Sequence, residues 1–502
     1  MISWRPLFNH TRHLPAREPS RIETFSIDMA EDISTLRVRC DREPREVSID
    51  PAWADYLYSL YTRHPEITPD QRDLSRDAFN RALRLKINRF PIFNLYDAQN
   101  QFRGRWDPSF SGWRILGSAG ASDGFVPGPI PPGPLRMEFL MPGHLPETVT
   151  LHFQMEGSRD TEESNIVENL FTLQEEESSE EQIRWYIGEL HEHTTRSNGH
   201  FTPEETMVAY HSAGYEFLAL ADHGVPPLDA LPLTPPFPLI RSQEVETACG
   251  HALLLGVREY TRIYPEEGPD SLPGLIYHTH LQGGLFAVVH PFSLDVSTPG
   301  PSWSAREMDW KGVDLLEVWP GRWAERFPEI LESLDLWDHL LNSGHRIFGT
   351  SGKGSGIPLD SSTVEQIPKI LVLSEGPSET QLLAALKQGH FYATVEPAIS
   401  LRVESEFGDA LTGEEIKIPV QHPYTLLVEV SQMERGFLKI KTNQGVYCQM
   451  PVSSTRGTQL KLYERARPGV QWYRLELYRY GRPLDELLAL GNPVFVRGFH
   501  RV

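Results

Sequence analysis

Histidines and carboxylates crowd the stretch GELHEHTTRSNGHFTPEETMVAYHSAGYEFLALADHG, residues 188–224. His191 and His193 stand at the end of a predicted strand, where alternation along the chain turns residues i and i+2 to the same side. Two imidazoles can therefore reach one cation. The next apolar run, EFLALADHG, ends in Asp222 and His223. A second predicted strand thus delivers polar groups at its carboxyl end.

Later predicted strands end in the same way. The segment RSQEVETACGH supplies Glu244 and His251, and AVVHP supplies His290. A single histidine is usually a hydrogen-bonded polar residue, but strand ends that repeatedly offer His, Asp and Glu indicate a metal site. Imidazole and carboxylate ligands without thiolates suit Zn, Mn or Fe.

A helix is expected between the first two of these strands. Thr202, a following proline and Glu205 have the pattern of a capping box with proline at the first helical position. The sequence therefore predicts a helix over residues 203–214. We expect its polar residues Glu204, Glu205 and His211 to be structural or solvated.

Four segments are predicted to position these residues. Residues 1–155 alternate as the antiparallel strands of a β-sandwich with a helical insertion, and the acidic stretch 156–182 is typical of a linker. Residues 183–396 alternate short apolar strands with helices, which predicts parallel strands under covering helices with the chemistry just after the strand ends. Strand patterns return over residues 397–502 as a C-terminal β domain.

Composition narrows the class of partner. The 47 basic and 68 acidic residues give a net charge of −21, which repels phosphate backbones and anionic membranes. We therefore expect a small-molecule substrate, no nucleic acid and no membrane, while a homo-oligomer stays open. The three cysteines are far apart, and the first residues lack a continuous apolar segment. A cytoplasmic protein is expected.

The motifs ELHEHTTRSNG and TPEETMVAYHSAGYEFLALADHG together resemble the opening of the PHP (polymerase and histidinol phosphatase) superfamily, and in particular its carbaryl-hydrolase-like (CehA/McbA) branch. The segments LLEVWPG, LWDHLLNSGHRIFG, GHFYATVEP and NPVFV extend the resemblance over residues 183–502, and PGPIPPG extends it more weakly toward the N-terminus. The resemblance implies an α/β fold, with a distorted (β/α)7 PHP barrel flanked by N-terminal and C-terminal β-sandwich-type regions.

The resemblance also implies a ligand set where residues match. His223 matches the histidine of the family's Asp-His motif, and the implied metal ligands are His191, His193, Glu244, His251 and His290. Asn198 stands where the family has an acidic residue, and Gly352 and Gly354 stand where it has a closing Asp and His. The cluster is therefore expected to hold one or two divalent ions rather than three.

Further roles are expected for the polar residues near these ligands and for the two glycines. Asp222 or His223 would carry protons, and Lys353 would either orient an anionic group or be an exposed loop lysine. If Gly352 and Gly354 account for a lost metal position, then Gly352→Asp with Gly354→His should restore it, unless the backbone angles at these glycines forbid a side chain.

Three functions remain open from the sequence. The first is a metal-dependent hydrolase of a phosphoester, ester or carbamate that uses metal-activated water. The second is a catalytically degenerate PHP-fold protein that binds a small molecule or a partner. The third is carbohydrate recognition by the N-terminal strands through Trp106 and Trp113, which are more often packing residues.

Overall fold

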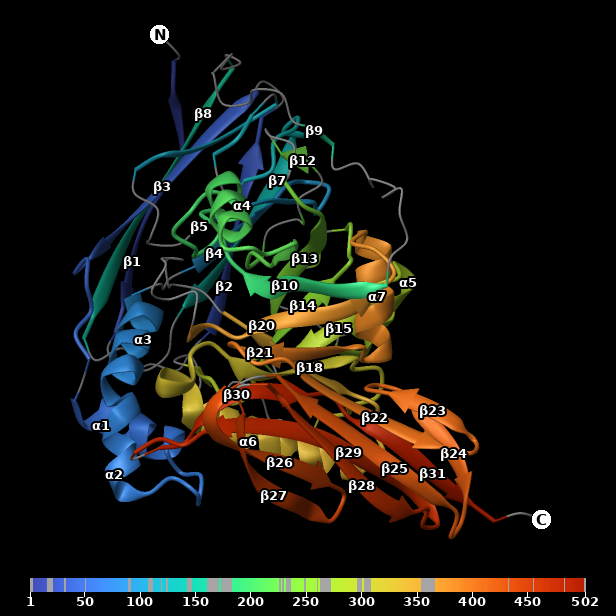
Figure 1. Cartoon of the computed structure of the whole chain (residues 1–502). Coiled ribbons are helices and arrows are strands. Elements are labelled where there is room, and N and C mark those ends of the chain that lie inside the picture. The colour runs from blue at the N-terminus through green and yellow to red at the C-terminus, as the bar shows by residue number, and fades with distance from the viewer. Residues whose placement is uncertain are drawn as a thin grey trace.

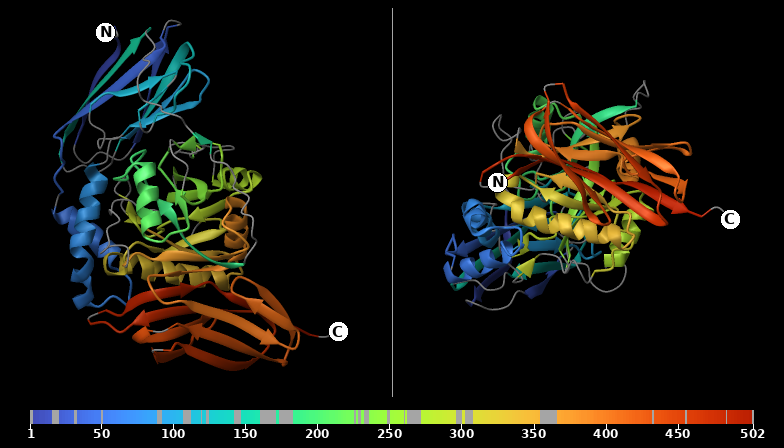
Figure 2. Two further views of the ribbon diagram at one scale, coloured as in Figure 1. Left: turned by 45° about the horizontal axis from the view of Figure 1, so that its top comes forward. Right: turned by 60° about the horizontal axis from the view of Figure 1, so that its bottom comes forward.

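The structure, a computed structural model, is a mixed α/β fold that is rich in strands (Figure 1). It describes residues 3–15, 21–30, 33–49, 51–88, 92–106, 112–118, 120–122, 125–141, 147–159, 171–172, 183–224, 227, 230–231, 236–247, 250–259, 261, 272–295, 300–301, 308–353, 366–431, 433–454, 456–482 and 484–500. In Figure 2 the N-terminal sheets, the central sheet and the C-terminal strands follow one another along the molecule. No helix in these ranges combines the length and the apolar character needed to cross a lipid bilayer.

The N-terminal part consists of two antiparallel four-stranded sheets that share one hydrophobic core. One sheet has the order β1 (Arg5–Leu14), β8 (Val149–Ser158), β3 (Thr35–Glu43) and β6 (Arg114–Gly117). The other has the order β2 (Arg21–Met29), β7 (Gly133–Met141), β4 (Ile92–Tyr96) and β5 (Phe102–Trp106). The rings of Phe93 on β4 and Phe153 on β8 lie 5.1 Å apart, edge to face, which joins the two sheets.

Both tryptophans considered for carbohydrate recognition contact other side chains of the N-terminal part. Trp106 is fully buried in this core and stacks on Phe93, so a role for its ring as a surface platform is wrong. The ring of Trp113 is covered by the Arg37 guanidinium, whose carbon lies 4.3 Å from the ring centre. Both side chains are used in packing.

The helical insertion forms α1 (Pro51–Tyr61), α2 (Pro69–Arg72) and α3 (Arg76–Asn88), which lie beside α6 (Trp323–Asn342) of the central part (Figure 1). The Tyr61 hydroxyl donates to the Glu325 carbonyl at 3.0 Å. His64 Nε2 lies 3.1 Å from Asp335 Oδ2, and Ile67 is part of the central hydrophobic core. These contacts attach the insertion to the part of the chain that carries the candidate site.

The central sheet has the strand order β19-β18-β15-β14-β13-β11-β10-β20-β21. Its strands are β10 (Arg184–Glu192), β11 (Phe217–Leu220), β13 (Leu239–Thr247), β14 (Gly250–Leu255), β15 (Leu285–Val288), β18 (Leu315–Pro320), β19 (Phe348–Gly352), β20 (Lys369–Ser374) and β21 (Phe391–Thr394). The helices α4 (Pro203–Ser212), α5 (Leu272–Leu281), α6 and α7 (Glu379–Gln388) connect or cover them.

The expectation of parallel strands holds only in part. The pairs β10–β11, β11–β13, β15–β18 and β18–β19 are parallel, but β14 runs antiparallel to both of its neighbours and β20 is antiparallel to β10. Two residues separate β13 from β14, and such a short connection makes a hairpin because a parallel crossover needs a dozen residues or more. The prediction was therefore wrong at β14 and β20.

The sheet is curled, so that β19, at one end of the strand order, lies close to β10. The Lys353 amide, just after β19, donates to Glu189 Oε1 of β10 at 3.2 Å. A Cβ placed on Gly352 of β19 would lie 2.6 Å from the Cβ of His191 on β10. The two strands therefore approach closely at the end of β10 that carries the histidines.

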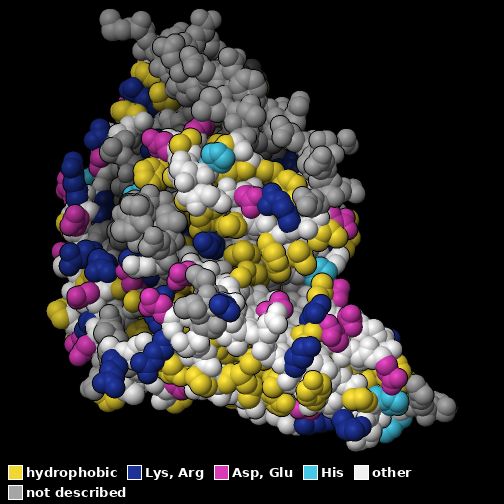
Figure 3. Space-filling view, in the orientation of Figure 1, with side chains coloured by type: hydrophobic (Ala, Val, Ile, Leu, Met, Phe, Trp, Pro, Cys, Tyr) yellow, Lys and Arg dark blue, Asp and Glu magenta, His cyan; other side chains and the backbone are white. Residues whose placement is uncertain are grey.

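The C-terminal strands continue this sheet. β21 pairs with β30 (Glu486–Gly491), which leads on to β29 (Gly469–Arg479), β26 (Met433–Thr442) and β27 (Gly445–Ser454), while β31 (Val494–Phe499) pairs with β29 and with β24 (Glu415–Pro419). A separate sheet holds β23 (Gly408–Leu411), β22 (Ile399–Ser405), β25 (Pro423–Val430) and β28 (Thr458–Arg465). On the face shown in Figure 3, hydrophobic side chains gather over these strands at the bottom of the view.

One C-terminal side chain supports β19 directly. Asn492 Oδ1 accepts from the Gly349 amide at 2.7 Å, and its Nδ2 donates to the carbonyls of Gly349 and Phe391 at 3.2 and 3.1 Å. Asn492 is fully buried. Its amide thus holds the backbone of β19 to that of β21 where the two strands share no ladder.

Candidate metal centre

Each predicted ligand lies on a central strand or in the connection that follows one. His191 is the penultimate residue of β10 and His193 follows that strand, while Glu244 lies within β13. His251 stands at the start of β14, which runs in the opposite direction. The connections after β15 and β11 carry the other two histidines, His290 and His223, and His223 forms an isolated parallel bridge with Glu244.

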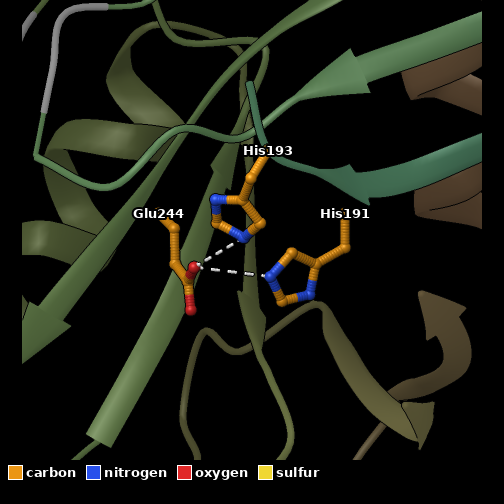
Figure 4. Close-up of side chains that lie close together, drawn as sticks. All are labelled: His191, His193 and Glu244. Atoms are coloured by element: carbon orange, nitrogen blue, oxygen red, sulfur yellow. Dashed lines mark hydrogen bonds and ion pairs between the residues drawn. The ribbon is translucent and has the colours of Figure 1, made fainter. Parts of the chain in front are cut away.

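The carboxylate of Glu244 is the centre of this cluster. Figure 4 shows the rings of His191 and His193 pointing toward it from β10 and the segment that follows. Five imidazole nitrogens surround its two oxygens. To Oε2 the distances are 3.4 Å from His191 Nε2, 3.1 Å from His193 Nε2 and 3.0 Å from His223 Nε2. To Oε1 they are 2.9 Å from His251 Nδ1 and 3.1 Å from His290 Nε2.

Burial and charge oppose each other at this carboxylate. Burial alone raises the pKa of Glu244, but His223 and His191 outweigh it and hold that pKa well below its usual range. Burial lowers the pKa of His191, while the carboxylates of Glu317 and Glu244 raise it well above its usual range. The pKa of His290 is lowered, chiefly by burial, although the Glu244 carboxylate raises it. The Glu244 carboxylate is therefore a buried anion surrounded by imidazoles, and these are groups that can bind a cation.

Glu317 is a member of the cluster that the sequence did not single out. It lies on β18, is fully buried, and accepts from His191 Nδ1 at 2.8 Å and from the His290 amide at 2.8 Å. The signal was present in LLEVWP, where one carboxylate interrupts a strand whose residues are otherwise apolar and buried. A buried carboxylate inside such a run needs a specific partner.

The donor atoms of the cluster fit a divalent cation. Three sets bring their donor atoms within 4.8 Å of one another: His191, His193 and Glu244; His191, His290 and Glu317; and His223, Glu244 and His251. All of these donors are imidazole nitrogens or carboxylate oxygens, the ligands that suit Zn, Mn or Fe. The cluster can therefore hold a divalent metal.

Asp222 precedes His223 of the cluster, and its carboxylate binds Thr194 and Ser197. Its Oδ1 accepts from the Thr194 amide at 2.8 Å and from Ser197 Oγ at 2.7 Å, and its Oδ2 accepts from Thr194 Oγ1 at 2.7 Å. Asp222 thus fixes the turn that follows His193. These contacts make it a support for a ligand-bearing segment.

Lys353 is buried, so the expectation of an exposed loop lysine is wrong. Its Nζ lies 2.8 Å from Glu192 Oε2, and the Tyr210 hydroxyl donates to the same oxygen. Glu192 stands between the two histidines of β10 and, by the alternation of a strand, faces the side away from them. The ammonium of Lys353 is therefore directed to an ion pair behind the histidines.

The residues at which the sequence differs from the PHP motifs are Asn198, Gly352 and Gly354, and the structure describes the first two. Asn198 is half-buried and its Oδ1 accepts from Ser197 Oγ at 3.2 Å, while Gly354 lies outside the described residues. Gly352 has an ordinary backbone angle, but a Cβ there would overlap Glu317 Oε1 and lie 2.6 Å from His191 Cβ. An aspartate at residue 352 would thus meet filled space, so steric overlap and not the backbone angle opposes the proposed restoration.

The helix between the first two strands forms as expected at its start. Thr202 Oγ1 accepts from the Glu205 amide, and Glu205 Oε2 accepts from the Thr202 amide, which confirms the capping box. The helix ends at Ser212, two residues earlier than predicted. His211 is exposed on it and takes no part in the cluster.

Comparisons with known proteins add a distant structural likeness. The chain is similar to a two-domain protein from Bacteroides vulgatus that contains a predicted PHP-like metal-dependent phosphoesterase, with 14% sequence identity and a TM-score of 0.36 over 65% of this chain and 99% of that one. No protein-family model matches the sequence, and a search of curated proteins finds no match. The function is therefore argued from the geometry of the chain itself.

Proposed function

We propose that the protein is a metal-dependent hydrolase of the PHP type, acting on a phosphoester, carboxylic ester or carbamate of a small molecule. The observation that supports this most strongly is the Glu244 carboxylate, fully buried and within 3.4 Å of nitrogens from five histidines. A divalent cation held in such a set supplies Lewis acidity and a water of lowered pKa.

The residues divide by depth. His191, His193 and Glu244 are buried, whereas the side chains of His251 and His290 are 22% and 17% exposed. Substrate would reach the cluster from the side of these two histidines, with the deeper residues fixing the cation. One or two ions fit this proposal, because Glu244 has histidines on both of its oxygens and the side chain at residue 352 is missing.

His223 remains the proposed proton carrier of the pair that the sequence singled out. Its Nε2 lies 3.0 Å from Glu244, whereas all the hydrogen bonds described for the Asp222 carboxylate go to Thr194 and Ser197. Asp222 is proposed to act through the turn that it holds. Lys353 is proposed to act through Glu192, because its ammonium is paired there.

A non-catalytic binding protein is the second candidate. The observation that favours it is the pair of lost side chains, Asn198 for an acidic residue and Gly352 for an aspartate, which removes negative charge from the cluster. Such a site would hold a small ligand with or without a cation and would not turn it over.

Metal content and hydrolysis, measured on the same preparation, separate the two candidates. We expect elemental analysis of the purified chain to find Zn, Mn or Fe, and aryl phosphate, aryl acetate and aryl carbamate substrates to show which bond is cleaved. Glu244→Gln should lose most of the metal and the activity, whereas His211→Gln, which changes an exposed histidine on α4, should keep both. Bound metal without turnover of any of these substrates would favour the binding protein. A metal-free wild-type chain would contradict the proposed hydrolase.

A further inference from the structure

Glu317 of β18 forms hydrogen bonds with two of the histidines that face Glu244. We infer that Glu317, on β18, is the carboxylate that positions His191 and His290 in this centre. This inference rests on the proposed metal centre. It assigns Glu317 a role that works through His191 and His290.

The first contact sets the orientation of a ring. Oε1 of Glu317 accepts from His191 Nδ1 at 2.8 Å, and the other ring nitrogen, Nε2, lies 3.4 Å from Glu244 Oε2. A carboxylate on one imidazole nitrogen places the proton there and leaves the lone pair of the other nitrogen for a metal. Glu317 thereby determines which atom His191 presents to the centre.

The second contact holds a strained backbone. Oε2 of Glu317 accepts from the His290 amide at 2.8 Å, and His290 has a φ of 29°, which is uncommon for a residue with a side chain. The same residue places its Nε2 at 3.1 Å from Glu244 Oε1. One buried carboxylate therefore fixes a ring on β10 and a backbone turn after β15.

Gly352 provides the space for this arrangement. It lies on β19 and pairs with Pro320, three residues beyond Glu317 on the neighbouring strand. A Cβ at residue 352 would overlap Glu317 Oε1 and press on the Cβ of His191. In the conformation seen here, the Glu317 carboxylate occupies the space that a side chain at residue 352 would need.

Glu317→Gln tests the inference with almost no change of shape. The His290 amide can only donate, so the glutamine oxygen must face it, and the glutamine NH2 then faces His191 Nδ1. His191 has to accept at Nδ1 and carry its proton on Nε2, the atom that faces Glu244. We expect the affinity for Zn²⁺ to fall about 10- to 100-fold, the usual effect of losing such a carboxylate.

The measurement is a competition between a chelating dye and the metal-depleted full-length chain for Zn²⁺ alone. Glu476→Gln, which neutralises a carboxylate buried in the C-terminal part, is the matched control and should change the affinity by no more than about twofold. Thermal melting of each variant, recorded without metal, tests that the chain remains folded.

Two further backgrounds separate positioning from ligation. In His191→Ala, where the remaining set of His223, Glu244 and His251 can still bind, adding Glu317→Gln should change the affinity by only about twofold, the usual scatter of additive effects. In His251→Ala, whose ring contacts Glu244 and not Glu317, the full reduction should persist.

The outcomes separate this inference from the proposed hydrolase. An unchanged affinity in Glu317→Gln, or an equal reduction in all three backgrounds, would overturn the positioning role, and the latter would make Glu317 an independent ligand or a general support. Zn²⁺ binding with the expected coupling but without hydrolysis would sustain the inference while the proposed reaction fails. A wild-type chain that binds no Zn²⁺ would overturn this inference, and one that binds none of Zn²⁺, Mn²⁺ and Fe²⁺ would overturn the proposed hydrolase as well.

Discussion

Lys353 Nζ lies 2.8 Å from Glu192 Oε2, and both side chains are buried. The pair joins the residue after β19 to the residue between the two histidines of β10, so it closes the sheet at the point where those strands approach each other. The Glu192 carboxylate also accepts from the Tyr210 hydroxyl and, at Oε1, from the His193 amide. Removal of the lysine would leave this buried carboxylate with these two neutral donors.

Lys353→Met should therefore destabilise the chain by about 3–5 kcal/mol, the usual result of removing one partner of a buried ion pair. The double variant Lys353→Met with Glu192→Gln should recover part of that loss, because no unpaired charge remains. Urea unfolding measures both, with Lys387→Met on the exposed side of α7 as the control. If the single variant is as stable as the wild type, the ion pair is not formed in solution.

Gly352→Ala should weaken Zn²⁺ binding and lower the melting temperature together, because its Cβ meets Glu317 and His191. Overpacking of this kind typically costs about 1–3 kcal/mol. Gly349→Ala is the matched control on the same strand: its Cβ would lie 2.7 Å from the Trp337 ring, away from the cluster. It should lower the melting temperature and leave the affinity for Zn²⁺ unchanged. Equal effects of the two variants on Zn²⁺ would argue against the special place of Gly352.

Asp222→Asn should be tolerated better than Asp222→Ala. The amide oxygen can still accept from the Thr194 amide and Ser197, and the Thr194 hydroxyl can rotate to accept from the new NH2. Alanine removes the acceptor of the Thr194 amide and hydroxyl, at about 1–3 kcal/mol for each buried group. Thermal melting and metal content report the difference. Loss of hydrolysis in Asp222→Asn with full metal content would instead assign Asp222 a proton-transfer role.

Chelation should lower the melting temperature of the wild type and leave that of Glu244→Gln unchanged. A ligand that binds only the folded chain stabilises it by about 2.7 kcal/mol at a concentration 100 times its dissociation constant. Differential scanning fluorimetry with and without a chelator, followed by re-addition of Zn²⁺, measures this. A chelator effect of equal size in Glu244→Gln would place the bound metal elsewhere.

The contact between the helical insertion and α6 should depend on pH. Although burial lowers the pKa of His64, its hydrogen bond to Asp335 raises it overall, and the same bond lowers the pKa of Asp335. The stabilisation from a raised histidine pKa is complete below the unfolded value and disappears as the pH rises through the folded value. That from the aspartate disappears as the pH falls through its lowered value. The contribution of this ion pair to stability is therefore largest at pH values between the lowered pKa of Asp335 and the raised pKa of His64.

Asp335→Asn measures this contribution as a difference from the wild type in urea unfolding at pH 5.5 and pH 8. Because the Asp335 side chain is 66% exposed, we expect only about 0.2–1 kcal/mol at pH 5.5 and less at pH 8. Glu332→Gln, which removes the neighbouring pair with Arg63, should change less between the two pH values, because Glu332 raises the pKa of His64 by less than Asp335 does. A larger effect of Asp335→Asn at pH 8 would contradict the assigned direction.

The sequence was most informative where a polar residue ends an apolar run. His191, His193, Glu244, His251 and His290 were predicted as one cluster, and the structure brings all five together with His223. Strand ends are legible because the chain changes there from buried to polar. The capping box at Thr202 was legible for a similar reason, since its pattern is local.

The sequence was less informative where a contact depends on neighbouring strands. Glu317 lies inside a buried apolar run, which indicates a carboxylate with a specific partner. Which residues are its partners depends on the pairing of β18 with β15 and β19, and the local sequence does not contain that information. The burial of Lys353 depends on the return of β19 to β10. The direction of β14 was misjudged because an apolar strand has the same composition in either orientation.

The side chain of Asn492 connects the C-terminal strands to β19. Its amide binds the backbone of β19 three residues before Gly352, and β30, which precedes it, continues the ladder of β21. The C-terminal strands are therefore part of the same cooperative folding unit as the histidine cluster, although they contribute none of its ligands. A fragment that ends at residue 396 would leave the edge of β21 open to pairing with other chains. In hydrogen exchange, the amides of β19 should open together with those of β30.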